Sequence, residues 1–276
     1  MKIGISLPVR EMKSDLTAIK DFAVAAEELG YTHLRIPDQV LRPGNKHLHE
    51  PLTLLAWIAG FTKKIELVAS VIVSPARQTV LLAKQAAQID LLSQGRLRMG
   101  LGVGASEEEF RYLSENFDNR GKRCSEQIKL LKELWSKEEV NFNGTWHSVE
   151  KAGLNPLPVQ QPIPIWIGAQ ANPVETVTER IGTLADGWFV LCDPKEFSAL
   201  NNKIKAYSES AGRDFASIGT EAGVAVVGPR EHEWESRVRV WKEVGLTHIC
   251  LRTLGGGLDS SAHIEKLKEI LPRIPR

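Results

Sequence analysis

One glycine-rich segment has a spacing that suggests ligand binding: Gly100-Leu101-Gly102-Val103-Gly104, which follows an apolar run. A dinucleotide-binding loop reads G-x-G-x-x-G, opens a helix and is followed by an acidic residue about 20 positions later. The spacing here is G-x-G-x-G, without the glycine that would open such a helix, so it does not favour a dinucleotide. Two interpretations stay open. Gly102 and Gly104 let a flat ligand or the backbone pass close to a strand end, or they form a tight turn that needs a positive φ.

A second segment, Gly168-Ala169-Gln170-Ala171-Asn172-Pro173, joins a predicted strand to a predicted helix. Its small residues would leave backbone N–H groups free at a helix N-terminus, where anions bind. Gln170 and Asn172 can add side-chain donors. In the alternative interpretation, Asn172 caps a helix whose first residue is Pro173. The two interpretations are compatible with each other.

Two further segments give weaker signals. Gly255-Gly256-Gly257 follows the last predicted strand, where barrels often bind phosphate, but a mobile loop explains three glycines better. His47 and His49 have side chains that ligate metals, yet their loop has no matched third ligand elsewhere in the chain. We therefore predict no metal site. The sequence also has no G-x-S-x-G nucleophile elbow.

Charge and cysteine content exclude several classes of function. The chain has 35 Lys and Arg against 34 Asp and Glu, a net charge of +1, so no basic excess points to nucleic acid or to an anionic membrane. Cys124, Cys192 and Cys250 are far apart, which fits a reducing compartment and excludes a cysteine zinc site. No stretch approaches the ~20 apolar residues of a membrane span. We expect a cytoplasmic protein.

The elements that must position these segments alternate regularly. Strands apolar on both sides belong to a parallel sheet covered by helices, and eight strand–helix units in 276 residues predict a (β/α)8 TIM barrel. A doubly wound open sheet is the alternative. The predicted strands are 2–7, 33–37, 65–73, 96–101, 165–168, 187–191, 218–227 and 247–252. The predicted helices are 15–29, 52–61, 79–92, 120–135, 174–181, 194–211, 230–244 and 260–271.

No domain linker interrupts this alternation. We therefore expect one domain over residues 1–276, with a small insertion around 139–164 that contains a hairpin turning at Asn143-Gly144. Barrel active sites lie at the carboxyl ends of the strands, so the segments described above would meet at one mouth.

Four segments resemble a known family. They are AAEELGYTHLRIPDQVLRP (25–43), KKIELVASVIVSPARQTVLLAKQAAQIDLLSQGRLRMGLGVG (63–104), NPLPVQQPIPIWIGAQ (155–170) and LADGWFV (184–190). On these motifs, the chain resembles the luciferase-like monooxygenases, in particular their short F420-dependent oxidoreductase branch. The resemblance runs from Ile3 to about Ile270.

The resemblance implies a barrel that binds reduced FMN or the deazaflavin F420 at its mouth. The cofactor phosphate would lie at Gly168, Ala169 and Gln170, and the ring near Ser70 and Val71. The family often has a non-proline cis peptide there, expected here between Ser70 and Val71. Gly104 and Ser106 are further candidate contacts.

One position departs from the family pattern. Many members have His after the aspartate that follows the second strand, whereas this chain has Asp38-Gln39. Asp38 and Gln39 are our candidate catalytic residues. Gln can donate and accept hydrogen bonds but cannot shuttle a proton, so acid–base chemistry by a histidine is not expected at this point.

The predicted activity is that of an oxidoreductase acting on a small organic substrate. With F420 a hydride would be transferred, and with FMN the substrate would be oxygenated. Two alternatives stay open: a non-catalytic flavin-binding barrel, and a metal-dependent barrel hydrolase using His47 and His49. The loops 42–50, 106–119 and 254–260 would select the substrate. The resemblance also implies a homodimer through the helices at 52–61 and 80–91.

Overall fold

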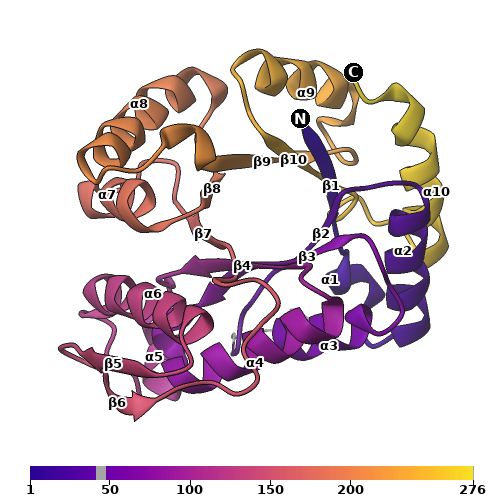
Figure 1. Ribbon diagram of the computed structural model, residues 1–276. Coiled ribbons are helices and arrows are strands. Elements are labelled where there is room, and N and C mark those ends of the chain that lie inside the picture. Colours follow the sequence, from indigo (N-terminus) through magenta and orange to yellow (C-terminus); the bar gives the residue numbers. More distant parts are fainter. Residues whose placement is uncertain (42–47, 276) are drawn as a thin grey trace.

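The computed structural model describes residues 1–41 and 48–275, and at its centre eight parallel strands form a closed barrel (Figure 1). Around the barrel the strands follow the order β1-β10-β9-β8-β7-β4-β3-β2. This confirms the predicted (β/α)8 barrel. The barrel strands are β1 (Lys2–Ser6), β2 (His33–Ile36), β3 (Glu66–Val73), β4 (Leu97–Gly102), β7 (Ile165–Gly168), β8 (Gly187–Val190), β9 (Gly219–Ala225) and β10 (His248–Arg252).

Helices form a ring outside the strands (Figure 1). Those that follow the barrel strands are α2 (Leu16–Glu28), α3 (Pro51–Ala59), α4 (Thr79–Ser93), α6 (Arg120–Ser136), α7 (Glu175–Leu184), α8 (Pro194–Ser210), α9 (Trp234–Glu243) and α10 (Ser260–Ile270). The predicted helix 230–244 is shorter than expected, because Glu231–Glu233 form a 3-10 turn before α9 begins. No helix within the described ranges is both long and apolar enough to cross a membrane.

Local sequence explains where these helices begin and end. In α2 the buried side chains Ile19, Phe22 and Ala26 recur at helical spacing and face the barrel. Asp15 caps the helix by accepting a hydrogen bond from the N–H of Ala18 at 2.9 Å. The chain then turns at Gly30, whose φ of +83° suits glycine.

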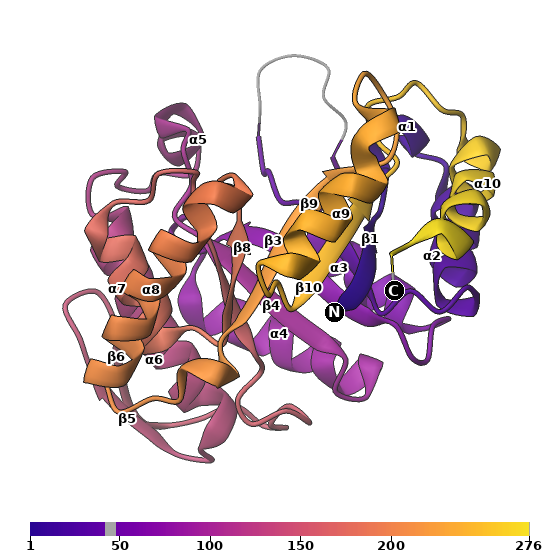
Figure 2. The ribbon, with the colours of Figure 1, turned by 90° about the horizontal axis from the view of Figure 1, so that it is seen from above.

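Two short helices lie at the carboxyl ends of the strands. These are α1 (Val9–Met12), after β1, and α5 (Glu107–Tyr112), after β4. In Figure 2 both lie at the upper end of the barrel. The segment 106–119 was expected to be a loop only, so α5 is an addition to the prediction.

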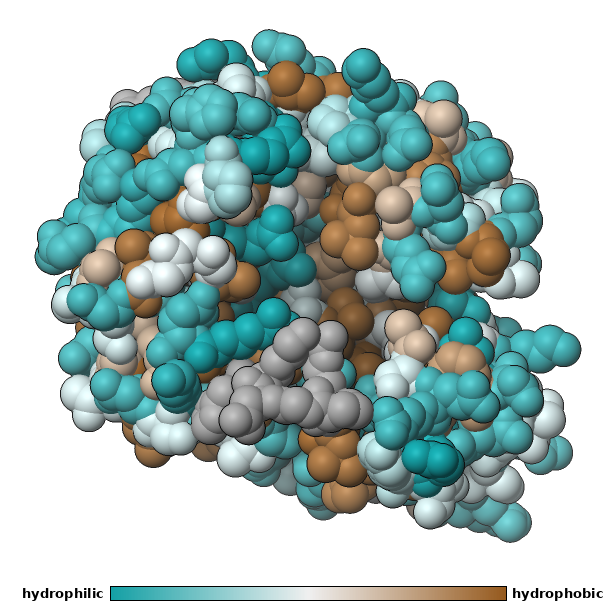
Figure 3. All heavy atoms as spheres, turned by 180° about the vertical axis from the view of Figure 1, so that it is seen from behind, coloured by the Kyte–Doolittle hydropathy of each residue, from teal (hydrophilic) through white to brown (hydrophobic). Residues whose placement is uncertain are grey.

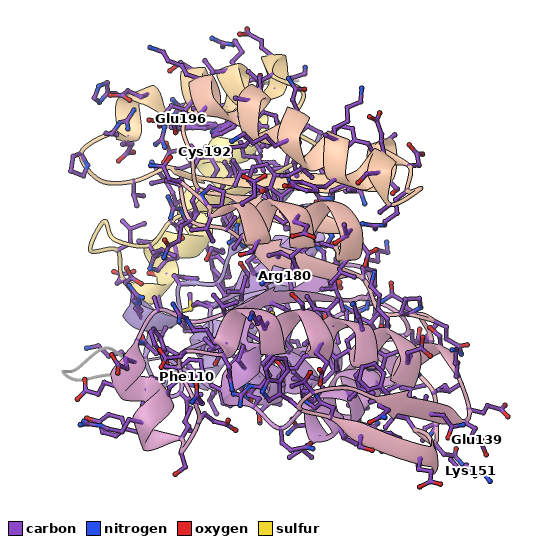
Figure 4. All side chains as sticks on the ribbon, turned by 90° about the vertical axis from the view of Figure 1, so that its left-hand side faces the viewer. Phe110, Glu139, Lys151, Arg180, Cys192 and Glu196 are labelled. Atoms are coloured by element: carbon purple, nitrogen blue, oxygen red, sulfur yellow. The ribbon has the colours of Figure 1, made fainter. Side chains whose placement is uncertain are left out.

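A hairpin of β5 (Val140–Asn143) and β6 (Ser148–Ala152) lies outside the barrel. Figure 4 labels Glu139 and Lys151 at the base of this hairpin, at the end of the molecule opposite Phe110 of α5. The segment that follows is fastened to the barrel because Gln160 donates from its side chain to Asp90 (2.7 Å) and to the carbonyl of Leu97 (2.8 Å). Because α5 lies at the carboxyl ends of the strands, where ligands bind in barrels, the base of the hairpin is far from that mouth.

Candidate functional site

An ion-pair network centred on Glu221 lies in the lower interior of the barrel, and its Arg35 and Glu221 also line a cavity at the mouth. Arg35 donates to one carboxylate oxygen of Glu221 at 2.9 Å, and Arg98 donates to the other at 2.8 Å. His33 lies 3.3 Å from the second oxygen, and Arg98 also binds Glu66 at 2.8 Å. Burial alone would raise the pKa of Glu221, but the charges of His33, Arg35 and Arg98 hold it well below its ordinary value.

Aromatic rings fill the space beside this network. The guanidinium of Arg98 lies 4.2 Å from the ring centre of Trp166, and Trp166 packs against Phe189 at 5.6 Å. Gly187 and Gly219 make room for Trp166, since a Cβ at either would come within 2.3 Å of its ring. The rings of Trp166 and Phe189 thus pack this part of the interior, and Phe189 also lines a cavity at the mouth.

His33, Glu221 and Cys250 lie close enough to suggest a metal centre, with their ligand atoms within 4.8 Å of one another. However, both oxygens of Glu221 already accept hydrogen bonds from arginines. Burial also raises the pKa of Cys250 to about 12, so the thiol keeps its proton. The cluster is therefore part of the ion-pair network. Of the two histidines considered for a hydrolase, His47 lies outside the described residues and His49 is 2.6 Å from the carbonyl oxygen of Lys13.

Above this network, the side chain of Val71 forms a shelf at the mouth. The peptide bond between Ser70 and Val71 is cis, as the resemblance predicts, and it coincides with a break in register between β3 and β4. A Cβ at Gly102 would lie 2.5 Å from Val71, and a Cβ at Gly168 would lie 2.9 Å from it. The two glycines therefore let β4 and β7 close against Val71. We call Val71 with Gly102 and Gly168 the Val71 shelf.

Gly104 and Ser106 position α5 beside the shelf. Gly104 has a φ of +76°, and a Cβ there would lie 2.8 Å from the ring of Phe110. The tight-turn interpretation therefore applies to Gly104, whereas close approach explains Gly102. Ser106 caps α5, because its hydroxyl oxygen accepts a hydrogen bond from the N–H of Glu109 at 3.2 Å.

The Asp38-Gln39 turn is held from two sides. The carboxylate of Asp38 accepts hydrogen bonds from the N–H of Val73 (3.0 Å) and from Arg77 (2.9 Å). Burial raises the pKa of Asp38, and the charge of Arg77 opposes that rise. On the other side, the buried carboxylate of Glu109 accepts from the N–H of Val40 at 2.7 Å. Sequence reasoning missed Glu109, which looks like one of three acidic residues on a surface helix.

The predicted phosphate segment passes from half-buried Gly168 through buried Ala169 to exposed Gln170. The prediction that Asn172 caps a helix beginning at Pro173 is wrong. Helix α7 begins at Glu175, because Val174 is extended with a ψ of 156°. Val174 gives α7 no side-chain cap, so the first backbone N–H groups of this helix are left for another acceptor.

The triple-glycine segment does not offer an anion site. The N–H of Gly255 donates to the carboxylate of Glu11 at 2.6 Å. A carboxylate thus occupies the position that a phosphate would need. Gly255 and Gly257 have φ values of +88° and +72°, which accounts for glycine at both positions.

The open space at the mouth lies near arginines. Figure 3 shows the face opposite that of Figure 1, hollowed at its centre. A cavity of about 360 Å³ lies between the ends of β8 and β10, the middle of β9 and helix α9, and a second of about 220 Å³ lies near the ends of β1 and β2. Arg35 and Arg252 line both. Sequence reasoning missed these residues, although a charged residue within an otherwise apolar strand, such as Arg35, is a signal of interior function.

Comparison with known proteins places this geometry in a family. The family described as luciferase-like monooxygenase matches residues 1–263. The F420-dependent glucose-6-phosphate dehydrogenase of Gordonia bronchialis is 28% identical over 285 residues, covering 99% of this chain and 81% of that protein.

Solved structures show the same fold. An F420-dependent secondary alcohol dehydrogenase in complex with an F420–acetone adduct superposes with a TM-score of 0.83 at 17% identity, covering 100% of this chain and 99% of the other. A monooxygenase from Streptomyces bottropensis gives a TM-score of 0.81 at 18% identity, covering 99% and 98%. Identities this low support the fold alone. The match over residues 1–263, however, shows that this chain belongs to the luciferase-like monooxygenase family.

Proposed function

We propose that this protein is an oxidoreductase that uses F420 or reduced FMN, bound at the carboxyl mouth of the barrel, to act on a small organic substrate. Family membership supports the class, and F420 occurs in the names of the dehydrogenases reported above. The observation that carries the proposal is the Val71 shelf. Two strands without side chains at Gly102 and Gly168 close against one apolar side chain at the mouth.

The residues present fit such a cofactor. The side chain of Val71 gives an apolar surface against which an aromatic ring can pack. Ala169 and Gln170 follow the shelf directly and lead to α7, whose N-terminus has no side-chain cap. Backbone N–H groups at a helix N-terminus favour phosphate. We therefore assign the ring to Ser70 and Val71 and the phosphate to Gly168, Ala169 and Gln170.

When bound, F420 gives or accepts a hydride, whereas reduced FMN activates oxygen. The residues of the chain orient the reactants. The Ser70 hydroxyl oxygen accepts hydrogen bonds from Arg35 at 3.0 Å (Nε) and 2.5 Å (Nη2), so its proton is left to donate. Asp38 is a positioning residue because its carboxylate accepts hydrogen bonds from the N–H of Val73 and from the guanidinium of Arg77. Gln39 would orient a reacting oxygen without transferring a proton.

Gly104 and Ser106 act through α5 in this proposal. They set the start of the helix whose Glu109 holds the turn at Val40. They would therefore shape the mouth and limit access of water rather than touch the reacting atoms.

The experiment is a titration of the purified protein with F420, FMN and reduced FMN, followed by fluorescence. We expect saturable binding of one of them, weakened by Gly168→Asp. A second candidate, a non-catalytic flavin-binding protein, is favoured by Gln39, which lacks the acid–base chemistry of histidine. Turnover of any substrate by the loaded protein would exclude that candidate.

We propose one domain over residues 1–276, a cytoplasmic location, no nucleic-acid partner and a homodimer. Trp57 on α3 and Leu81 on α4 are exposed apolar side chains on the two helices expected at the dimer interface. Light scattering of the purified protein tests the oligomeric state.

A further inference from the structure

We infer that Arg237 and Arg252 form a binding site for an anionic group of the organic substrate, such as a phosphate, a sulfate or a carboxylate. The assignment of that group to the substrate rests on the proposed function. The site is the 360 Å³ cavity between the ends of β8 and β10, the middle of β9 and helix α9. In the closed barrel, β9 lies four strands away from β3 in either direction, so the β9 wall of this cavity lies across the mouth from Val71.

The cavity has an excess of positive charge. Four arginines line it (Arg35, Arg230, Arg237 and Arg252), against two carboxylates, Asp193 and Glu221. Glu221 already binds Arg35 and Arg98. Asp193 is engaged in a capping box at the start of α8. The charge of Asp193 still raises the pKa values of Arg230 and Arg237, but the arginines of the cavity outnumber its carboxylates.

The four arginines differ in their partners. Arg35 is paired with Glu221 at 2.9 Å, and Arg230 binds Glu233 at 2.6 Å. Among the residues that the structure describes, no carboxylate forms an ion pair with Arg237 or with Arg252. The Nε of Arg252 is also buried without a hydrogen-bond acceptor. The Nε of Arg98 lacks an acceptor as well, but Arg98 has two carboxylate partners. Arg252 has none and lines the cavity, so a ligand there can supply an acceptor to its guanidinium.

The arginines also repel one another. Burial lowers the pKa of Arg237, and the charges of Arg230 and Arg252 lower it further. Burial likewise lowers the pKa of Arg252. Holding cations together in a partly buried space destabilises the free protein. An anion that enters the cavity removes this repulsion and forms charge-assisted hydrogen bonds, and guanidinium groups bind carboxylate and phosphate in two-point geometry.

Gly223 lets the guanidinium of Arg252 lie close against the backbone of β9. A Cβ at Gly223 would lie 3.2 Å from the Nε of Arg252, so a larger side chain there would displace it. On the other wall, Figure 4 shows Cys192 after β8 beside Glu196 in the first turn of α8. A cavity of this volume accepts a small organic molecule.

The position of the cavity separates this anion from the cofactor. The cofactor phosphate is assigned to the segment between β7 and α7, whereas Arg237 and Arg252 belong to α9 and the end of β10. A molecule bound here would extend toward Arg35 and Ser70, which lie at the centre of the mouth and are joined by a hydrogen bond of 3.0 Å. The reacting part of the substrate would thus meet the ring while its anionic end stays on the arginines.

The test compares the wild-type protein with Arg237→Gln and Arg252→Gln. The control is Arg239→Gln, which alters an exposed arginine of the same helix. Binding of inorganic phosphate, and of phenyl phosphate as a small phosphate monoester, is measured by calorimetry on cofactor-loaded protein. We expect each cavity variant to bind both probes about tenfold more weakly or worse, while Arg239→Gln matches wild type and all variants keep their cofactor affinity.

Equal phosphate affinity in wild type and Arg237→Gln would overturn the site. Loss of cofactor binding in Arg237→Gln would assign the arginines to the cofactor instead. Binding of inorganic phosphate without phenyl phosphate would reveal a site for the free ion and overturn the substrate assignment. Arg237 is only half-buried, so its variant decides the matter even where Arg252→Gln fails to fold. Wild-type protein that binds phosphate but neither F420 nor FMN would refute the proposed function and leave the anion site standing.

Discussion

Arg98 and Arg252 are arginines on barrel strands in two regions with opposite chemistry. Arg98, in the lower interior, is fully buried, binds Glu66 and Glu221 at 2.8 Å each and lies over Trp166. Arg252, at the mouth, forms no ion pair with any residue that the structure describes, and it lines two cavities. The Nε of both arginines lacks an acceptor, so the carboxylate partners of Arg98 are what distinguishes the two. The charged groups of the lower interior therefore pair with one another and stabilise the fold, whereas Arg252 at the mouth is available to bind a ligand.

This difference indicates whether a buried charged residue contributes to folding or to ligand binding. Both carboxylate oxygens of Glu221 are paired with arginines, so changes there should affect folding. Arg237 and Arg252 at the mouth have no carboxylate partner among the described residues, so changes to them should affect binding while the fold survives.

The largest effect is expected for Glu221→Gln. The substitution leaves Arg35 and Arg98 buried without their shared carboxylate, and breaking a buried pair costs about 3–5 kcal/mol of unfolding free energy. Urea denaturation measures it. Glu235→Gln is the matched control, because it breaks a surface pair with Arg273 and should cost at most about 1 kcal/mol. Equal effects of the two substitutions would show that the network is not structural.

Gly168→Asp should weaken cofactor binding about 100-fold or more, which corresponds to about 2.7 kcal/mol. It adds bulk against Val71 and negative charge at the proposed phosphate position. Gly168→Ala adds bulk alone and should weaken binding less. Fluorescence titration measures both, and unchanged affinity in Gly168→Asp would refute the proposed phosphate position.

Glu109→Ala should lower the unfolding free energy by about 1–3 kcal/mol, because the N–H groups of Val40 and Leu41 lose their acceptor. Glu109→Gln keeps a carbonyl oxygen that can accept, so it should restore most of the loss. Urea denaturation of both variants checks this. A Gln variant as unstable as the Ala variant would argue against the role of the acceptor.

A smaller effect is expected from pH. Burial, with the charges of Arg98 and His33, lowers the pKa of His248 from 6.5 to about 3. Below pH 6.5 the unfolded chain binds a proton at His248 that the folded chain does not, so stability should fall as pH falls. The slope from this group is at most about 1.4 kcal/mol per pH unit. His248→Asn should flatten it between pH 6.5 and 5 in thermal unfolding curves, and an unchanged slope would contradict the assignment.

The sequence was sufficient to predict the barrel because its strands are apolar on both sides. Strand β3 was predicted at 65–73 and spans Glu66–Val73. The start of α7 was missed because extended Val174 is not marked by any local motif. The partners of Glu221 could not be predicted either, since Arg98 is 123 residues away and meets it only when the barrel closes.

In the candidate site, too, some features could be predicted from the sequence and others could not. The resemblance indicated the position of the cis bond between Ser70 and Val71, which the structure confirms. It did not indicate that Asp38 holds Val73 and Arg77, nor that Glu109 holds Val40, because these contacts link residues distant in the chain. Arg237 and Arg252 are distinguished only by their lack of partners, which no sequence pattern records.

The central claim is that the mouth of this barrel binds a reduced flavin or deazaflavin on the Val71 shelf. Fluorescence titration of the purified protein with F420, FMN and reduced FMN tests it most directly. The account predicts saturable binding of at least one of the three, lost in Gly168→Asp and retained in Arg239→Gln. Absence of saturable binding for all three, in a protein that circular dichroism shows to be folded, would contradict it.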